Sequence, residues 1–214
     1  MLCEAYAHGF ELCSACSAKL KTTAWGVASV SHFNARIPVL WREVYGGILT
    51  DAIYRTKYQG DWGKARMLGK TLGELPRPWL GPSPIIVPIP LAGGRLAKRG
   101  YNQSQIIAAQ LARQWGLAIE SRWLIKQRAT PRQATLDWEE RKSNLAHTFS
   151  ASSHMQGKRI LLVDDIMTTG ATLKEAIRAV SIVHGHVVAA AVIAHVPKAK
   201  HHVQCRSRRA GNPA

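Results

Sequence analysis

The sequence predicts an α/β fold in which helices flank a parallel β-sheet. Three short apolar runs, typical of buried strands, occupy residues 85–89, 159–163 and 186–194. Segments with apolar residues at helical spacing alternate with them at 102–115 and 170–184. This alternation favours a parallel sheet with helices on both faces. The chain of 214 residues is long enough for one domain of ordinary size with small appendages.

The first 84 residues are less regular than the rest. Residues 1–20 carry three of the four cysteines, and residues 21–45 are mixed and indicate no clear element. Apolar side chains near helical spacing predict helices over 48–58 and 62–75. The proline-rich stretch that follows them, up to residue 84, is typical of a linker.

From residue 85 onward each element has clearer boundaries. The helix over 102–115 begins at Asn102, a good N-cap, and Gly116 lies just past its end. Residues 117–125 are apolar enough for a further strand. The chain from Lys198 onward carries five Lys and Arg residues and no clear period, so we expect a flexible basic tail.

The net charge of +16 is the outstanding bulk property of the chain. Such a surface attracts phosphates, nucleic acids or acidic membranes, although a basic coat with a loose basic tail is the simpler alternative. No run of 18 apolar residues and no secretory signal occur, so neither a membrane span nor export is predicted, and we expect a cytoplasmic location. The chain has no Walker-type G-K-[ST] loop, so ATP hydrolysis of that kind is not predicted.

The stretch VDDIMTTGATLKEA, residues 163–176, places two adjacent carboxylates, Asp164 and Asp165, beside a loop suited to anions. Ligands of open parallel sheets bind beyond the carboxyl ends of strands, and these acids follow strand 159–163. The loop leads into a helix N-terminus, where N–H groups and the helix dipole favour a phosphate. The residues that we expect to contact the phosphate are Thr168, Thr169, Gly170, Ala171 and Thr172. Carboxylates beside a phosphate make sense for a ribose 5-phosphate, whose 2- and 3-hydroxyls the acids would take.

Residues 160–172, ILLVDDIMTTGAT, resemble the 13-residue phosphoribosyl pyrophosphate (PRPP) signature of type I phosphoribosyltransferases. The match comprises four apolar residues, two acids, two mixed residues and then Thr-Thr-Gly-x-Thr. A plain strand–turn–helix with an incidental acid pair is the alternative. The resemblance implies a type I phosphoribosyltransferase fold, with its PRPP-binding domain over residues 85–197.

Residues 87–105, VPIPLAGGRLAKRGYNQSQ, are similar to the pyrophosphate-loop region of the ComF/GntX subgroup, the competence-protein-F-like phosphoribosyltransferases. That subgroup has a V-P-x-P-L start and an R-G-[FY]-N-Q core. The expected pyrophosphate contacts are backbone N–H groups and cations, from Leu91, Ala92, Gly93, Gly94, Lys98 and Arg99. A basic surface loop before a well-capped helix is the alternative.

Two further stretches match the same subgroup. Residues 128–149 follow its R-x-T-x-x-Q-x-x-L-x-x-x-x-R-x-x-N-L pattern, and residues 46–72 resemble its helical lead-in with an L-K-Y-x-G segment. A long polar insertion between strands is typical of an active-site lid, and related enzymes have here a flexible loop that closes over PRPP. Its candidate residues are Arg128, Gln133, Arg141 and Asn144, of which the two guanidinium groups suit phosphate. A solvated helical hairpin is the alternative.

The cysteines raise the question of a metal site. Without an export signal, metal ligation in a reducing compartment fits them better than disulfides. ComF/GntX proteins often begin with zinc-ribbon-like pairs of CxxC, but here Tyr6 stands where a partner of Cys3 is expected. A tetrahedral Zn²⁺ site would need Cys3, His8, Cys13 and Cys16. A metal-free remnant is the alternative, so the expected segments are a degenerate zinc-knuckle-like 1–20, a helical lead-in and linker 21–84, the domain 85–197 and a basic tail 198–214.

The resemblance implies a site for PRPP with Mg²⁺, which is held mostly by substrate and water. Asp164 and Asp165 would stabilise positive charge at the anomeric carbon while an unidentified base or amine displaces pyrophosphate. A hypothesis of another class is a non-catalytic nucleotide- or single-stranded-DNA-binding competence factor that works with the DNA-uptake machinery. The basic charge and seven Trp residues allow contact with single strands.

Overall fold

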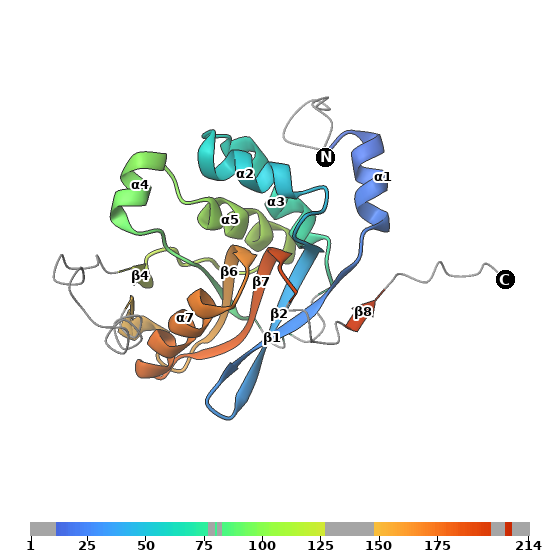
Figure 1. The fold of residues 1–214 in the computed structure, drawn as a ribbon. Coiled ribbons are helices and arrows are strands. Elements are labelled where there is room, and N and C mark those ends of the chain that lie inside the picture. The colour runs from blue at the N-terminus through green and yellow to red at the C-terminus, as the bar shows by residue number, and fades with distance from the viewer. Residues whose placement is uncertain (1–11, 77–79, 81–82, 127–147, 198–203, 207–214) are drawn as a thin grey trace, which may run out of the picture.

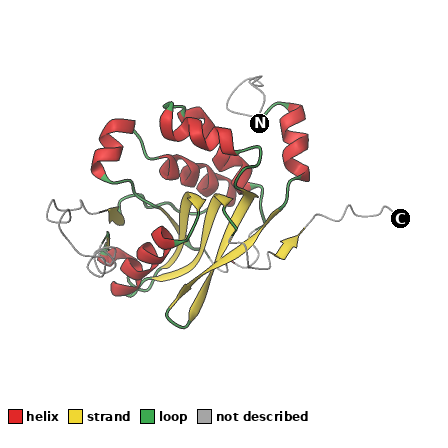
Figure 2. Cartoon of the chain, in the orientation of Figure 1, coloured by secondary structure: helices red, strands yellow, loops and turns green. Residues whose placement is uncertain are grey.

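The computed structural model describes residues 12–76, 80, 83–126, 148–197 and 204–206 (Figure 1). A sheet of six strands forms its centre, with the strand order β3-β6-β7-β2-β1-β8 (Figure 2). The strands span Trp25–His32 (β1), Ala35–Val44 (β2), Ile85–Pro88 (β3), Arg159–Met167 (β6), His186–His195 (β7) and Gln204–Arg206 (β8). Strands β3, β6, β7 and β2 are parallel, whereas β1 pairs antiparallel with β2 and with β8. The predicted α/β class with a mainly parallel sheet is therefore confirmed.

Helices cover both faces of this sheet (Figure 1). They span Ser14–Thr22 (α1), Thr50–Tyr58 (α2), Trp62–Gly73 (α3), Gly93–Arg99 (α4), Gln103–Trp115 (α5) and Ala171–Ile182 (α7). Leu161 and Val163 of β6 belong to the core with α1, α2, α3 and α5. Ile160 and Leu162 belong to the core with α7. Because side chains alternate across a strand and both faces are covered, β6 has to be apolar at every position from Ile160 to Val163.

Helix α5 is fixed firmly beside the sheet. Asn102 caps it by accepting a hydrogen bond from Ser104 N (3.1 Å), and Gly116 ends it with φ +61°. Gly69 of α3 lets the two helices approach closely, because a Cβ there would lie 2.7 Å from Ile107 O. The N-terminus of α5, which carries Gln103 and Ser104, is thereby held near β6.

The hairpin of β1 and β2 lies in residues for which the sequence indicates no clear element. From Gly26 to His32 every second residue of β1 is the less exposed one, but these positions hold Gly26, Ala28, Val30 and His32, so the sequence lacks a clear apolar period of two. The hairpin nevertheless completes the sheet, because β2 pairs in parallel with β7, Val39 opposite Ala190. The expected helical lead-in thus contains two strands besides α2 and α3.

The strand expected over 117–125 is divided. Ile119 forms a parallel bridge to Ile86 of β3, and Leu124–Lys126 (β4) pairs with Phe149–Ala151 (β5) in a separate two-stranded sheet. A short 3₁₀-helix, Ser153–Met155, leads from β5 toward β6. Within the stretch expected to be a basic tail, Gln204–Arg206 forms strand β8 along β1.

Candidate functional site

The acid pair lies within strand β6, where the neighbouring strand has ended. Strand β3 stops at Pro88, opposite Val163, whereas β6 continues beside β7 until Met167 pairs with His195. The prediction that this strand ends at residue 163 is wrong, because pairing with β7 alone extends it to Met167. Asp164 and Asp165 therefore lie on a part of β6 that pairs with β7 on one side and no longer with β3 on the other.

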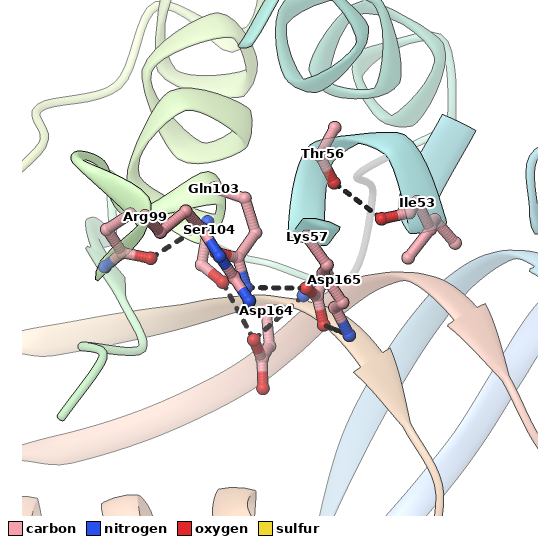
Figure 3. Close-up of polar contacts among 9 residues, drawn as sticks. Ile53, Thr56, Lys57, Arg99, Gln103, Ser104, Asp164 and Asp165 are labelled. Atoms are coloured by element: carbon pink, nitrogen blue, oxygen red, sulfur yellow. Dashed lines mark hydrogen bonds and ion pairs between the residues drawn. The ribbon is translucent and has the colours of Figure 1, made fainter. Parts of the chain in front are cut away.

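Asp165 is held at both of its carboxylate oxygens (Figure 3). Lys57 Nζ, from the last turn of α2, lies 2.9 Å from Oδ1. Gln103 Nε2, from the first turn of α5, donates to Oδ2 at 2.7 Å. Asp165 is only 4% exposed, so this ion pair and hydrogen bond offset the cost of burying its charge.

Asp164 is partly buried and lies in a different environment (Figure 3). Its Oδ1 accepts hydrogen bonds from Ser104 Oγ (2.8 Å) and from Asp165 N (2.9 Å). Burial, followed by the neighbouring charge of Asp165, raises the pKa of Asp164 to about 7, against the effects of these two hydrogen bonds and of Lys57. The charge of Asp164 therefore changes near neutral pH.

A further cation joins the acid pair through Gln103. The guanidinium of Arg99, at the end of α4, donates a hydrogen bond from Nη1 to Gln103 Oε1. The amide of Gln103 therefore accepts from Arg99 on one side and donates to Asp165 on the other (Figure 3). Gln103 is 3% exposed, so its bond to Asp165 is shielded from water, while the bond from the partly exposed Arg99 is shielded in part.

The segment between α4 and α5 is fastened to its surroundings by side chains. Tyr101 Oη donates to Thr56 O, next to Lys57 on α2, at 2.6 Å. Asn102 Nδ2 donates to Ile89 O, just past the end of β3, at 3.0 Å. These two bonds position the start of α5 against both α2 and the sheet.

The predicted phosphate loop follows β6 directly. Gly170 has φ +77°, and a Cβ there would lie 3.1 Å from Val30 Cγ2 of β1, so the position favours glycine. The loop residues Thr168, Thr169, Ala171 and Thr172 are all exposed. Helix α7 begins at Ala171, whose N–H donates to Thr169 Oγ1 at 3.3 Å, and Gly170 supplies no side-chain cap, so N–H groups later in the first turn are left for an anion.

The predicted pyrophosphate loop is shorter than expected. Ala92 precedes α4, and the N–H groups of Arg95 and Leu96 both bond to its carbonyl oxygen, so the helix begins at Gly93. Leu91 and Ala92 remain in the loop, while Gly93, Gly94, Lys98 and Arg99 belong to α4. Of these six, Arg99 is the residue that the described contacts connect to the acid pair.

Lys126 is a half-buried cation that sequence reasoning did not single out. It ends β4, with its Nζ 5.1 Å from the ring centroid of Phe149. Burial and the charge of Arg95 lower the pKa of Lys126, while the charge of Asp164 acts in the opposite direction. The residues expected in the flexible loop, Arg128, Gln133, Arg141 and Asn144, lie outside the described residues.

Sequence reasoning also missed Lys57, Gln103 and Ser104. Two of them lie in sequence patterns of the subgroup: Lys57 in a K-Y-x-G segment and Gln103 in the R-G-Y-N-Q core. Those patterns indicated a family but no contact, since the partners lie far apart in the chain. Ser104 was read only as part of a helix start.

Only half of the expected zinc ligands fall in the described part of the chain. Cys13 caps α1, and its Sγ accepts from Cys16 N at 3.4 Å. Cys16 packs in the core with Leu20. Cys3 and His8 lie outside the described residues. Within the described ranges, no three His, Cys, Asp or Glu side chains are grouped as metal ligands would be.

Comparison of the sequence with known proteins identifies the family to which the chain belongs. The sequence model of the "Phosphoribosyl transferase domain" matches residues 96–208, more than half of the chain. The chain is 39% identical over 90 residues to the DNA utilization protein YhgH of Salmonella typhi, covering 42% of this chain and 40% of that protein. It is 34% identical over 93 residues to Competence protein F of Haemophilus influenzae (42% and 41%), and 28% identical over 141 residues to Competence protein ComFC of Bacillus subtilis (63% and 54%).

The matches span about two fifths to one half of these relatives' lengths. Among the described helices, none is long and apolar enough to cross a membrane. The domain match covers the acid pair, the predicted phosphate loop and Arg99, but not Lys57. The chain belongs to the phosphoribosyl transferase domain family, and its relatives place it in the ComF group of that family.

Proposed function

We propose that this chain binds PRPP with Mg²⁺ and transfers its phosphoribosyl group to a nitrogen acceptor, with release of pyrophosphate. The observation that carries the proposal is the acid pair, which Lys57, Gln103 and Ser104 hold beside the exposed loop at the start of α7. Acids next to an anion-binding helix start suit a ligand that has both hydroxyls and a phosphate.

Asp164 and Asp165 have unequal roles in this proposal. Asp165 is already engaged by Lys57 and Gln103, so it serves chiefly as a fixed negative charge. Asp164 has both described hydrogen bonds on Oδ1, and Oδ2 is the oxygen that would accept the ribose 2- and 3-hydroxyls. The pair would stabilise the positive charge that develops at the anomeric carbon as pyrophosphate leaves.

The phosphates would be bound by separate elements. Thr168 to Thr172 and the start of α7 would hold the 5-phosphate, while residues 91–94, Lys98 and Arg99 would hold the pyrophosphate. The oxygen donors of this site fit Mg²⁺, which prefers carboxylate, phosphate and water oxygens. When bound, Mg²⁺ would neutralise charge on the pyrophosphate.

Calorimetry with Mg²⁺ and PRPP tests this function. We expect binding by the wild type and its loss in the double variant Asp164→Asn/Asp165→Asn. Glu175→Gln, a surface acid paired with Arg178 in α7, is the matched control and should bind normally. A wild type that binds no PRPP at millimolar concentration would refute the proposal. Binding would justify a screen of bases and amines for acceptor-dependent release of pyrophosphate.

A second candidate function is binding of single-stranded DNA, and the names of two relatives refer to DNA utilization and to competence. An exposed aromatic surface of α2 and α3 favours it: Tyr54, Tyr58 and Trp62 are 54%, 69% and 49% exposed. The rings of Tyr54 and Tyr58 lie 4.8 Å apart, and the guanidinium of Arg66 lies 6.0 Å from the Trp62 ring. Aromatic faces with interleaved cations bind single strands by stacking and charge. Affinity that falls linearly with log salt would support this function.

A further inference from the structure

We propose that Gln103 is a positioning residue that connects the pyrophosphate-binding cation Arg99 to the ribose-binding acid pair. The inference rests on the proposed function and deepens it, because it connects the residues that would bind the pyrophosphate of PRPP with those that would bind its ribose. It assigns a role to a residue of the R-G-Y-N-Q core that makes no expected contact with PRPP.

The first step of the argument is the use of both ends of the Gln103 amide. Oε1 accepts from Arg99 Nη1, and Nε2 donates to Asp165 Oδ2 at 2.7 Å. Only this orientation of the amide satisfies both partners, since the reversed amide would set an N–H group against the guanidinium. Glutamine is thus suited chemically to stand between a cation and a carboxylate.

The second step is that the amide has little freedom to move. Gln103 is 3% exposed and stands in the first turn of α5. Asn102 fastens this turn to Ile89 O, and Tyr101 fastens the preceding loop to Thr56 O. The backbone at the start of α5 therefore does not move when the Arg99 guanidinium shifts. The shift instead changes the position of the Gln103 amide, which contacts Asp165.

The third step is that Asp165 cannot adjust on its own. Lys57 holds Oδ1 at 2.9 Å while Gln103 holds Oδ2, so the carboxylate is fixed between α2 and α5. The backbone N–H of Asp165 in turn donates to Asp164 Oδ1. The contacts that begin at Arg99 thus hold the Asp165 side chain, and with it the negative charge beside Asp164, the residue that would receive the ribose hydroxyls.

A double-mutant cycle with ribose 5-phosphate tests the connection, because this ligand has no pyrophosphate for Arg99 to contact. We expect Arg99→Met to weaken ribose 5-phosphate binding about fivefold, and Gln103→Met to do the same. The double variant should be no weaker than Gln103→Met alone. Arg113→Met, which removes an exposed cation at the far end of α5, and Gln105→Met, which changes an exposed glutamine, are the controls and should stay within about twofold of the wild type.

The outcomes separate this inference from the proposed function. If Arg99→Met leaves the binding of ribose 5-phosphate unchanged, or if the two losses multiply in the double variant, the role of Gln103 is refuted. The proposed function would not be affected by either result. A wild type that binds neither ribose 5-phosphate nor PRPP would overturn both. Gln103→Glu gives a second reading if Gln103→Met does not fold, because an ionised Glu accepts from Arg99 but cannot donate to Asp165. We expect it to weaken ribose 5-phosphate binding at least as much as Gln103→Met.

Discussion

Lys57 Nζ lies 2.9 Å from Asp165 Oδ1, which joins the end of α2 to the middle of the sheet. This ion pair supplies a positive charge directly beside two adjacent carboxylates. It also explains why the helical lead-in belongs to the site, although the family match begins at residue 96.

Replacing Lys57 by Met should destabilise the fold and impair PRPP binding. The change leaves the buried Asp165 charge without its ion-pair partner, so we expect a loss of about 3 kcal/mol in the free energy of unfolding. The loss should be larger at about pH 8 than at about pH 5, because protonation of Asp164, whose pKa is about 7, removes a negative charge beside Asp165 at the lower pH. Urea unfolding at the two pH values measures this, with Lys158→Met on an exposed lysine as control. Equal, small losses at both pH values would contradict the role of Lys57.

Asp164→Asn should stabilise the protein above neutral pH while abolishing PRPP binding. The folded-state pKa of Asp164 is about 7 against an ordinary 3.8, so the folded protein binds a proton here that the unfolded chain releases. This contribution to stability is present at low pH and is lost as pH rises through about 7. The melting temperature of the variant relative to wild type should therefore rise between about pH 5 and pH 8. A difference that is constant across this range would contradict the raised pKa.

Gly170→Ala should weaken binding of ribose 5-phosphate. Alanine at φ +77° costs about 1 to 2 kcal/mol, and its Cβ would press on Val30, so the loop has to shift. Gly157→Ala is a matched control, because Gly157 has φ +66° with nothing within 4 Å of an added Cβ. Both variants should lose stability in thermal melts, but only Gly170→Ala should lose affinity by calorimetry. Equal affinities would argue against a phosphate at this loop.

Tyr58→Ala and Trp62→Ala should each weaken binding of an oligothymidylate if the aromatic surface stacks bases. We expect losses of about 1 to 3 kcal/mol for each stacked base, with the salt dependence of binding unchanged. Phe33→Ala removes an aromatic ring that is 88% exposed at the tip of the β1–β2 hairpin and serves as control. Fluorescence anisotropy at several salt concentrations measures both quantities. Losses that are equal in all three variants would show that this surface has no special part in binding.

The sequence predicted those parts of the molecule that local chemistry determines. The cap at Asn102, the stop at Gly116 and the buried strands each depend on residues close together in the chain, and the structure contains them. The β1–β2 hairpin was not predictable in this way, because β2 is stabilised by β7, a strand much later in the chain. The end of β6 was misplaced for the same reason, since β7 extends it to Met167.

The candidate site likewise contains residues that the sequence predicted and residues that it did not. Asp164, Asp165 and residues 168–172 form one continuous motif, so sequence alone selected them. Lys57 and Gln103 reach that motif only through the packing of α2 and α5, and the charges of Asp164 and of Lys126 in β4 interact. Contacts between such distant residues leave no periodicity in one sequence, although family patterns around Lys57 and Gln103 marked two of the positions.

The parallel pairing of β2 with β7 has a consequence for how the protein is made. Val39 faces Ala190, so a strand that leaves the ribosome early waits for nearly the whole chain before its partner exists. Until then one edge of the β1–β2 hairpin is open to pairing with other chains. Non-local pairing of this kind also slows folding, because a long loop has to close first. The N-terminal third of a nascent chain is therefore the part that most needs protection from aggregation during translation.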